Sequence, residues 1–146
     1  MRKLFQLLAI AAIALSIQCC GSDSSSSSNE NPNSELVEKV WDFSKENPEG
    51  FTINICNWEI PDKGIAVSYA ATQNSFDKKA LEKVIDHSLA HDCYVGGWLN
   101  PEDSHYYYDS VKLFAEDSLE AALAFGKSND QTSIYILSKD STIYLK

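Results

Sequence analysis

Two histidines precede an aspartate and a cysteine in the middle of the chain, and these residue types are those that bind zinc. His87 and His91 are four residues apart, which places both on one side of a helix. Asp92 and Cys93 follow directly, so imidazole, carboxylate and thiolate groups lie close in sequence. However, the chain has no HExxH or CxxC motif, and the spacing puts both histidines off the apolar stripe of the predicted helix. We therefore expect exposed or boundary histidines, with no metal or other cofactor.

Aromatic residues form a second group, in a predicted hairpin that follows the histidines. Alternation along a strand places Tyr106 and Tyr108 on one face, and Val111 and Leu113, which resemble core residues, on the other. We therefore expect Tyr106 and Tyr108 to be displayed beside Trp98. Such a surface can stack on sugar rings or anchor a protein partner. The alternative is that the rings fill cross-strand pairs over the neighbouring glycines.

A hydrolase is a third interpretation, because the chain is rich in serine and has titratable residues that could act as a relay. The residues available are His87, His91, His105, Asp103 and Asp109. No GxSxG motif supplies a nucleophile elbow, and no phosphate-binding loop or dinucleotide fingerprint is present. Because these catalytic motifs are missing from the sequence, we favour a binding protein over an enzyme.

Cys56 and Cys93 are the two thiols of the predicted folded part, and both lie at predicted strand ends. In an oxidising compartment they can form a disulfide, which would contribute about 3–4 kcal/mol to stability. Two buried free thiols are the alternative, since the distance between the residues does not follow from their spacing.

The elements that position these residues follow from hydrophobic periodicity, which predicts three helices and three hairpins. Helices are expected at 34–46, 75–91 and 118–126, with Ser34, Ser75 and Ser118 as N-caps, and hairpins at 51–70, 94–114 and 132–145. The order α-ββ-α-ββ-α-ββ predicts an α+β fold: a largely antiparallel sheet with the helices packed on one face.

The first residues predict export. Arg2 and Lys3 precede an apolar run from Leu4 to Ile17, which is too short to span a bilayer and has the flanks of a signal-peptide core. The sequence Gln18-Cys19-Cys20-Gly21 then resembles the lipobox of bacterial lipoproteins, the substrates of signal peptidase II.

That resemblance implies cleavage before a cysteine that carries acyl chains. We favour Cys20, since Cys19 is a small residue before the cut and Ile17 an aliphatic one; Cys19 is the alternative site, preceded by Gln18. The start of the mature chain resembles lipoproteins of the Bacteroidota. It implies a protein anchored in the cell envelope by its N-terminal lipid, at the outer membrane.

Three segments follow from this interpretation: a signal peptide (1–19), a lipidated cysteine with a serine-rich flexible tether (20–34), and a single α+β domain (35–146). Removing the signal peptide leaves 10 Lys and Arg against 21 Asp and Glu, a net charge of −11 with neutral histidines. This charge disfavours nucleic acid as a partner.

Several short stretches of the domain resemble a set of small bacterial proteins of unknown function. They are Gly50–Thr52, Gly64–Val67, Thr72–Phe76, Val95–Trp98, Tyr107–Ser110 and Ala124–Gly126. The resemblance implies one domain and supplies no catalytic residue. We therefore expect a membrane-anchored binding domain that contacts a protein partner in the envelope, in an immunity-type or accessory role. A surface glycan-binding lipoprotein is the alternative.

Overall fold

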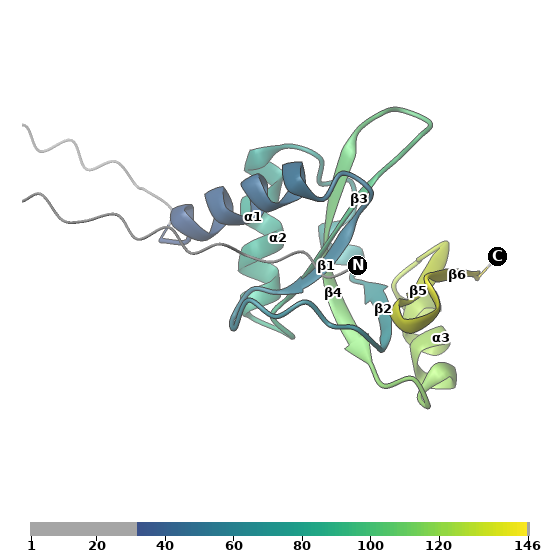
Figure 1. Ribbon diagram of the computed structural model, residues 1–146. Coiled ribbons are helices and arrows are strands. Elements are labelled where there is room, and N and C mark those ends of the chain that lie inside the picture. The colour runs from purple at the N-terminus through teal and green to yellow at the C-terminus, as the bar shows by residue number, and fades with distance from the viewer. Residues whose placement is uncertain (1–31, 146) are drawn as a thin grey trace, which may run out of the picture.

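The computed structural model describes residues 32–145, and in this range the predicted α+β class and element order are confirmed (Figure 1). The predicted signal peptide, both lipidation sites and most of the tether lie outside it. No helix within it is long and apolar enough to cross a membrane. The elements are α1 (Ser34–Glu46), β1 (Phe51–Asn54), β2 (Ile65–Ser68), η1 (Ala70–Thr72), α2 (Lys78–Leu89), β3 (Tyr94–Leu99), β4 (Tyr106–Phe114), α3 (Leu119–Ser128), β5 (Ser133–Ile136), η2 (Leu137–Lys139) and β6 (Ser141–Tyr144).

The predicted helix caps are only partly right. Asn33, and not Ser34, occupies the N-cap position of α1, whereas Ser118 does precede α3, without a side-chain capping bond. Helix α2 begins three residues later than expected because Asp77 caps it, accepting a hydrogen bond of 2.7 Å from the Ala80 amide. Ser75 is instead buried beside β4, where its carbonyl accepts the Tyr108 amide.

The six strands form one antiparallel sheet in the order β1-β3-β4-β2-β5-β6. The second and third predicted hairpins are confirmed, as β3–β4 and β5–β6. The first is wrong: β1 pairs with β3, and β2 pairs with β4 and β5. The buried side chains of Ile65, Ala66 and Val67 are in keeping with a strand inside the sheet that has a neighbour on each edge.

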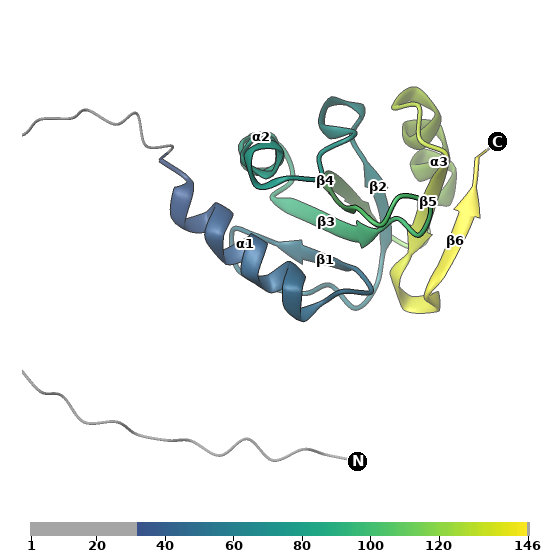
Figure 2. The same ribbon diagram turned by 90° about the horizontal axis from the view of Figure 1, so that it is seen from above.

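All three helices pack on one face of the sheet, as predicted, and the main core lies beneath α1 and α2 (Figures 1 and 2). Because directly paired residues share a face, the register places Ile53, Val95 and Tyr108 together on this side. They join the apolar stripes of the two helices in a first cluster: Val37, Val40, Ile53, Ile55, Leu81, Val84, Ile85, Val95 and Tyr108.

A second, smaller cluster lies beneath α3, and a polar seam separates the two. Its buried members are Ile65, Val67, Ala122, Ile134 and Ile136. In the seam, the Tyr69 hydroxyl donates to the Asp92 carboxylate, and Lys112 lies 3.7 Å from that carboxylate. The Tyr69 ring contacts Phe125 of α3 and His87 of α2, and so links the two helices across the sheet.

Cys56 and Cys93 form a disulfide, with their Cα atoms 5.7 Å apart. The Ile55 amide donates to the Cys93 carbonyl at 2.8 Å, so the covalent link lies next to the last backbone contact between the β1 and β3 chains. Edge strand β1 is only four residues long. The disulfide therefore anchors a short edge strand that has β3 as its one neighbour in the sheet.

The buried Tyr108 hydroxyl gives a test of how α1 is fixed to the sheet. The Ser44 hydroxyl donates to the Trp41 carbonyl, so the Tyr108 hydroxyl, 2.7 Å from Ser44 Oγ, is the donor in their contact. We predict that Tyr108→Phe lowers the free energy of unfolding by about 1 kcal/mol, and that Ser44→Ala costs about 1–3 kcal/mol because it leaves a buried donor unpaired.

Urea unfolding of the two single variants and the double variant provides the measurement. The double variant should lose less stability than the two single losses added together. Strict additivity would show that the two hydroxyls are not coupled.

Candidate functional site

The tyrosines predicted to form a displayed surface are on the wrong face. Tyr108 is 2% exposed in the first core cluster, and Tyr106 is partly buried with its hydroxyl donating to the Asn47 carbonyl. Burial raises the pKa of both hydroxyls above the usual value. Trp98 is exposed as expected, but it lies on the opposite face from these two rings.

The cause is the position of the core on β4. The face of β4 that carries Val111 and Leu113 was predicted to be the core face because both residues are aliphatic. The helices instead pack against the other face, which carries Tyr108, Ser110 and Phe114. Gly97 makes this possible, because a Cβ there would lie 2.5 Å from the Phe51 ring and 2.7 Å from the Tyr106 ring. The predicted alternative, aromatic rings packed over a glycine, therefore describes Tyr106.

The face of the sheet away from the helices carries a different aromatic pair. Trp98 and Tyr107 are directly opposite each other on β3 and β4, and their rings stack with centroids 5.2 Å apart. Trp98 is 45% exposed, and Phe76, 43% exposed, meets the edge of the Tyr107 ring. The Tyr107 hydroxyl donates to Asp103 at 2.7 Å. These contacts fix the pair near the hairpin that projects from the sheet in Figure 1.

Asp109 lies beside this pair on the same face, opposite Gly96. Its carboxylate accepts a long hydrogen bond of 3.4 Å from the Trp98 indole N–H, and the Ser68 hydroxyl also stabilises it. These contacts do not offset desolvation, and burial raises the pKa of Asp109 to about 6 from 3.8. The fold therefore holds a carboxylate whose charge is incompletely compensated.

A groove of about 320 Å³ runs from the aromatic pair to the loop after α3. Its lining is polar and acidic, with two carboxylates and no Lys, Arg or His among the described residues. Asn74 and Asp130 line it with φ angles of 62° and 53°, a left-handed conformation that Asn and Asp tolerate better than most residues. The lining residues are Gln73, Asn74, Trp98, Asn100, Tyr107, Asp109, Asp130, Gln131 and Thr132.

The histidine pair lies on the helix-covered face, away from this groove. His87 and His91 stack with centroids 3.9 Å apart, and His91 Nδ1 contacts the His87 carbonyl. Burial lowers the pKa of His87, and the nearby positive charges of His91 and Lys83 lower it further by smaller amounts. Cys93 belongs to the disulfide, so it has no thiolate to offer. Within residues 32–145, no three His, Cys, Asp or Glu side chains gather as a metal site would require.

The residues of the expected catalytic relay are not brought together. His105 and Asp103 are 3.5 Å apart on the exposed β3–β4 loop, whereas His87 contacts Ser110 Oγ at 2.9 Å on the other face of the sheet. Ser110 is 0% exposed, so a substrate has no route to its hydroxyl. The serine–histidine contact holds α2 against β4.

Sequence reasoning missed most of the groove, although some signals were present. Strand alternation pairs Tyr107 with Asp109 on one face, and the asparagine and aspartate at 74 and 130 are residue types typical of left-handed turns. Nothing local indicated that the loop after α3 meets the β3–β4 hairpin, because that proximity depends on the sheet order. No protein-family model, curated protein or solved structure matches this chain.

The raised pKa of Asp109 predicts a pH-dependent gain in stability for Asp109→Asn. The pKa of Asp109 is about 6 in the folded protein, above the ordinary aspartate value of 3.8 that applies to the unfolded chain. Between these two pH values the folded protein therefore holds a proton that the unfolded chain has released. The stability of the parent protein relative to the variant therefore falls as pH rises from about 4 to about 6. At pH 7 we expect Asp109→Asn to be more stable by about 1–3 kcal/mol, and at pH 3.5 the difference should nearly vanish.

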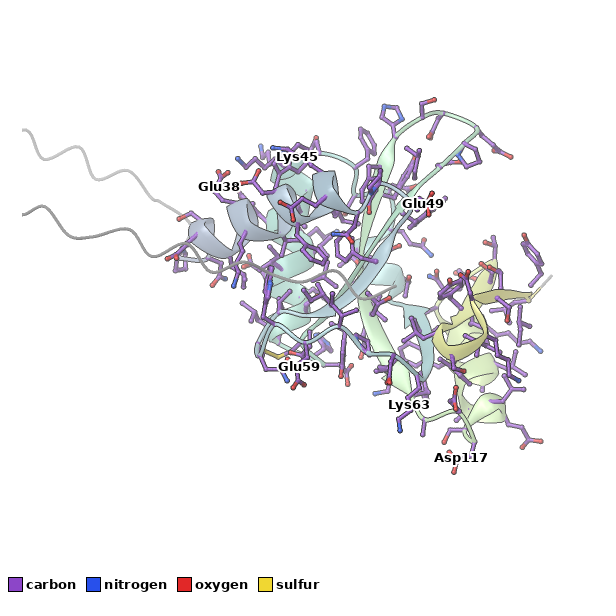
Figure 3. The ribbon with its side chains drawn as sticks, in the orientation of Figure 1. Glu38, Lys45, Glu49, Glu59, Lys63 and Asp117 are labelled. Carbon is purple, nitrogen blue, oxygen red and sulfur yellow. A yellow bond between two sulfur atoms is a disulfide. The ribbon has the colours of Figure 1, made fainter. Side chains whose placement is uncertain are left out.

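Urea unfolding at several pH values measures this difference. Asp117→Asn removes the same charge from an exposed loop at the opposite end of the molecule from the β3–β4 hairpin, and so controls for net charge (Figure 3). A difference between Asp109→Asn and the parent that stays constant from pH 3.5 to pH 7 would contradict the prediction.

Proposed function

We propose that this protein is a lipid-anchored binding protein of the bacterial cell envelope, whose acidic domain contacts a basic protein partner through the groove on the helix-free face of the sheet. The observation that carries the proposal is the groove itself: an exposed stacked Trp–Tyr pair beside two carboxylates, with no basic side chain among the described lining residues. An immunity-type or accessory role fits such a domain.

The anchor is supported by the N-terminal sequence, where a basic start and a short apolar run precede the lipobox-like cysteines. The Cys56–Cys93 disulfide supports an oxidising location such as the envelope. A serine-rich tether of this kind leaves a domain free to reorient above a membrane. The domain can then turn toward a partner at the same membrane surface, so binding does not require the domain to be held in one orientation.

Charge supports a basic partner in two ways. The net charge of −11 after signal-peptide removal attracts a cationic surface at long range. At short range, Asp109 is held partly buried without a neighbouring cation, which costs stability in the free protein. A positive group from a partner would remove that cost, so the same residue that destabilises the free domain favours the complex.

The binding experiment compares two pairs of substitutions that change net charge equally. Asp109→Asn with Asp130→Asn neutralises the groove, and Glu46→Gln with Asp117→Asn neutralises two exposed carboxylates elsewhere. The full lipidated protein in detergent is titrated with cytochrome c, a lysine-rich basic protein, by calorimetry. We expect the groove pair to weaken binding at least about tenfold and the remote pair less than about threefold.

Equal weakening by both pairs would mean that only net charge matters, and it would contradict a role for the groove. Acetylated cytochrome c, which has lost its lysine charges, should not bind the parent protein.

One observation favours a second candidate, glycan binding. The groove combines the stacked Trp98–Tyr107 pair with side-chain amides from four residues, which is a lining that suits sugar rings and hydroxyls. The amides belong to Gln73, Asn74, Asn100 and Gln131. Glycan-array binding by the full protein that is lost in Trp98→Ala, but kept in Asp109→Asn, would favour this candidate.

Lipidation predicts a defined mass. Intact mass spectrometry of protein extracted from membranes should give a chain that begins at Cys20 and carries two or three acyl chains. Cys20→Ser should release or block the protein, whereas Cys19→Ser should leave it lipidated. An unmodified N-terminal residue in the membrane fraction would contradict the anchor.

A further inference from the structure

We infer that the groove is a lysine site: the alkyl part of a partner's lysine side chain lies on the exposed face of Trp98, and its ammonium group is bound by Asp109. This inference rests on the proposed function and specifies its chemistry. It commits to a lysine in a protein partner, and treats a free diamine or a sugar as outcomes that would overturn it.

The aromatic pair offers a flat, preorganised surface to a side chain. One face of the Trp98 indole is covered by Tyr107, and 45% of the side chain remains exposed. Tyr107 is itself held by Phe76 and by its hydrogen bond to Asp103, so the pair is preorganised. An indole face attracts cations and also packs well against methylene groups. A lysine side chain presents both features in sequence along its length.

Asp109 offers a negative charge beside that surface. It lies next to the exposed indole, close enough for the Trp98 N–H to donate to it at 3.4 Å. No ion pair involves Asp109 in the described residues, whereas Asp92, the carboxylate on the covered face, has both Lys112 and Tyr69. A partly buried carboxylate beside an exposed indole is the arrangement that a compact cation satisfies.

The remaining accepting capacity of Asp109 favours lysine over arginine. The indole N–H and the Ser68 hydroxyl already engage the carboxylate, so a guanidinium group forming its two parallel bonds would compete with these donors for the remaining lone-pair positions. An ammonium group needs only one such contact and donates its other hydrogens elsewhere. The Asp130 carboxylate and the amides along the groove provide these further acceptors.

The test uses the full protein and a small probe, Nα-acetyl-lysine-N-methylamide, with binding followed by the change in tryptophan fluorescence and by calorimetry. We expect saturable binding with a dissociation constant on the order of millimolar, as one ion pair and one cation–π contact allow. The Nε-acetylated probe should not bind, and the corresponding arginine probe should bind at least about threefold more weakly.

The variants separate the groove from the rest of the protein. Trp98→Ala and Asp109→Asn should each weaken binding about tenfold or more, while Trp98→Phe, which keeps an aromatic face, should lose less than about threefold. Asp117→Asn, which removes an exposed carboxylate far from the groove, should bind as the parent does. Thermal unfolding of every variant checks that the fold is intact.

Each other outcome has a defined meaning. Probe binding that survives both Trp98→Ala and Asp109→Asn overturns the site. Putrescine binding more than about tenfold tighter than the lysine probe, or competition by a methyl glycoside without lysine binding, overturns the choice of ligand. If the lysine probe binds as expected but cytochrome c does not, the lysine site stands and the proposed protein-binding function fails.

Discussion

Strand β4 lies between β3 and β2, and its alternating side chains meet two different environments. On one side Tyr108 and Ser110 contact α1 and α2 through buried hydroxyl hydrogen bonds. On the other side Tyr107 and Asp109 lie on the face that no helix of the described chain covers. A shift of register by one residue would exchange these sets and would bury the carboxylate of Asp109 among apolar helices. The position of the core and the existence of the groove therefore depend on the same alternation.

Under the proposed function, stability and binding would oppose each other at the groove. Asp109 is partly buried, and its pKa of about 6 means that its ionised form costs free energy in the unbound protein. An asparagine could accept the Trp98 N–H without that cost. Within the seam on the other face, by contrast, Asp92 is compensated by Lys112 and Tyr69. The two aspartates thus differ: Asp92 has a cation and a hydroxyl as partners within the fold, whereas Asp109 has no ion pair among the described residues.

The helices and strands could be predicted well from the sequence because they depend on local signals. Their arrangement in the sheet was predicted less well because it depends on contacts between distant parts of the chain. The stripes of α1 and α2 and the β3–β4 and β5–β6 hairpins follow from periodicity and short turns. The pairing of β1 with β3 requires a contact across more than 30 intervening residues, so adjacency along the chain misleads there. The face of β4 that the helices cover was misassigned because Val111 and Leu113 are aliphatic. Val111 is indeed buried, but on the helix-free face, whereas Tyr108 lies beneath the helices with its hydroxyl bonded to Ser44. The groove inherits both errors, since it needs the correct face and the correct sheet order.

The two hydrophobic clusters also divide the domain into parts of unequal strength. The larger includes α1 and α2 and packs beside the disulfide, whereas the smaller depends on α3 and short strands at the other edge of the sheet. Local opening should therefore begin with α3, β5 and β6, while the rest of the fold stays closed. The groove is lined by Trp98 and Asp109, which belong to the part with the larger cluster, and by residues 130–132, which belong to the part with the smaller cluster. A ligand that contacts both sides would oppose this opening, so occupancy of the groove would be coupled to the local stability of α3, β5 and β6.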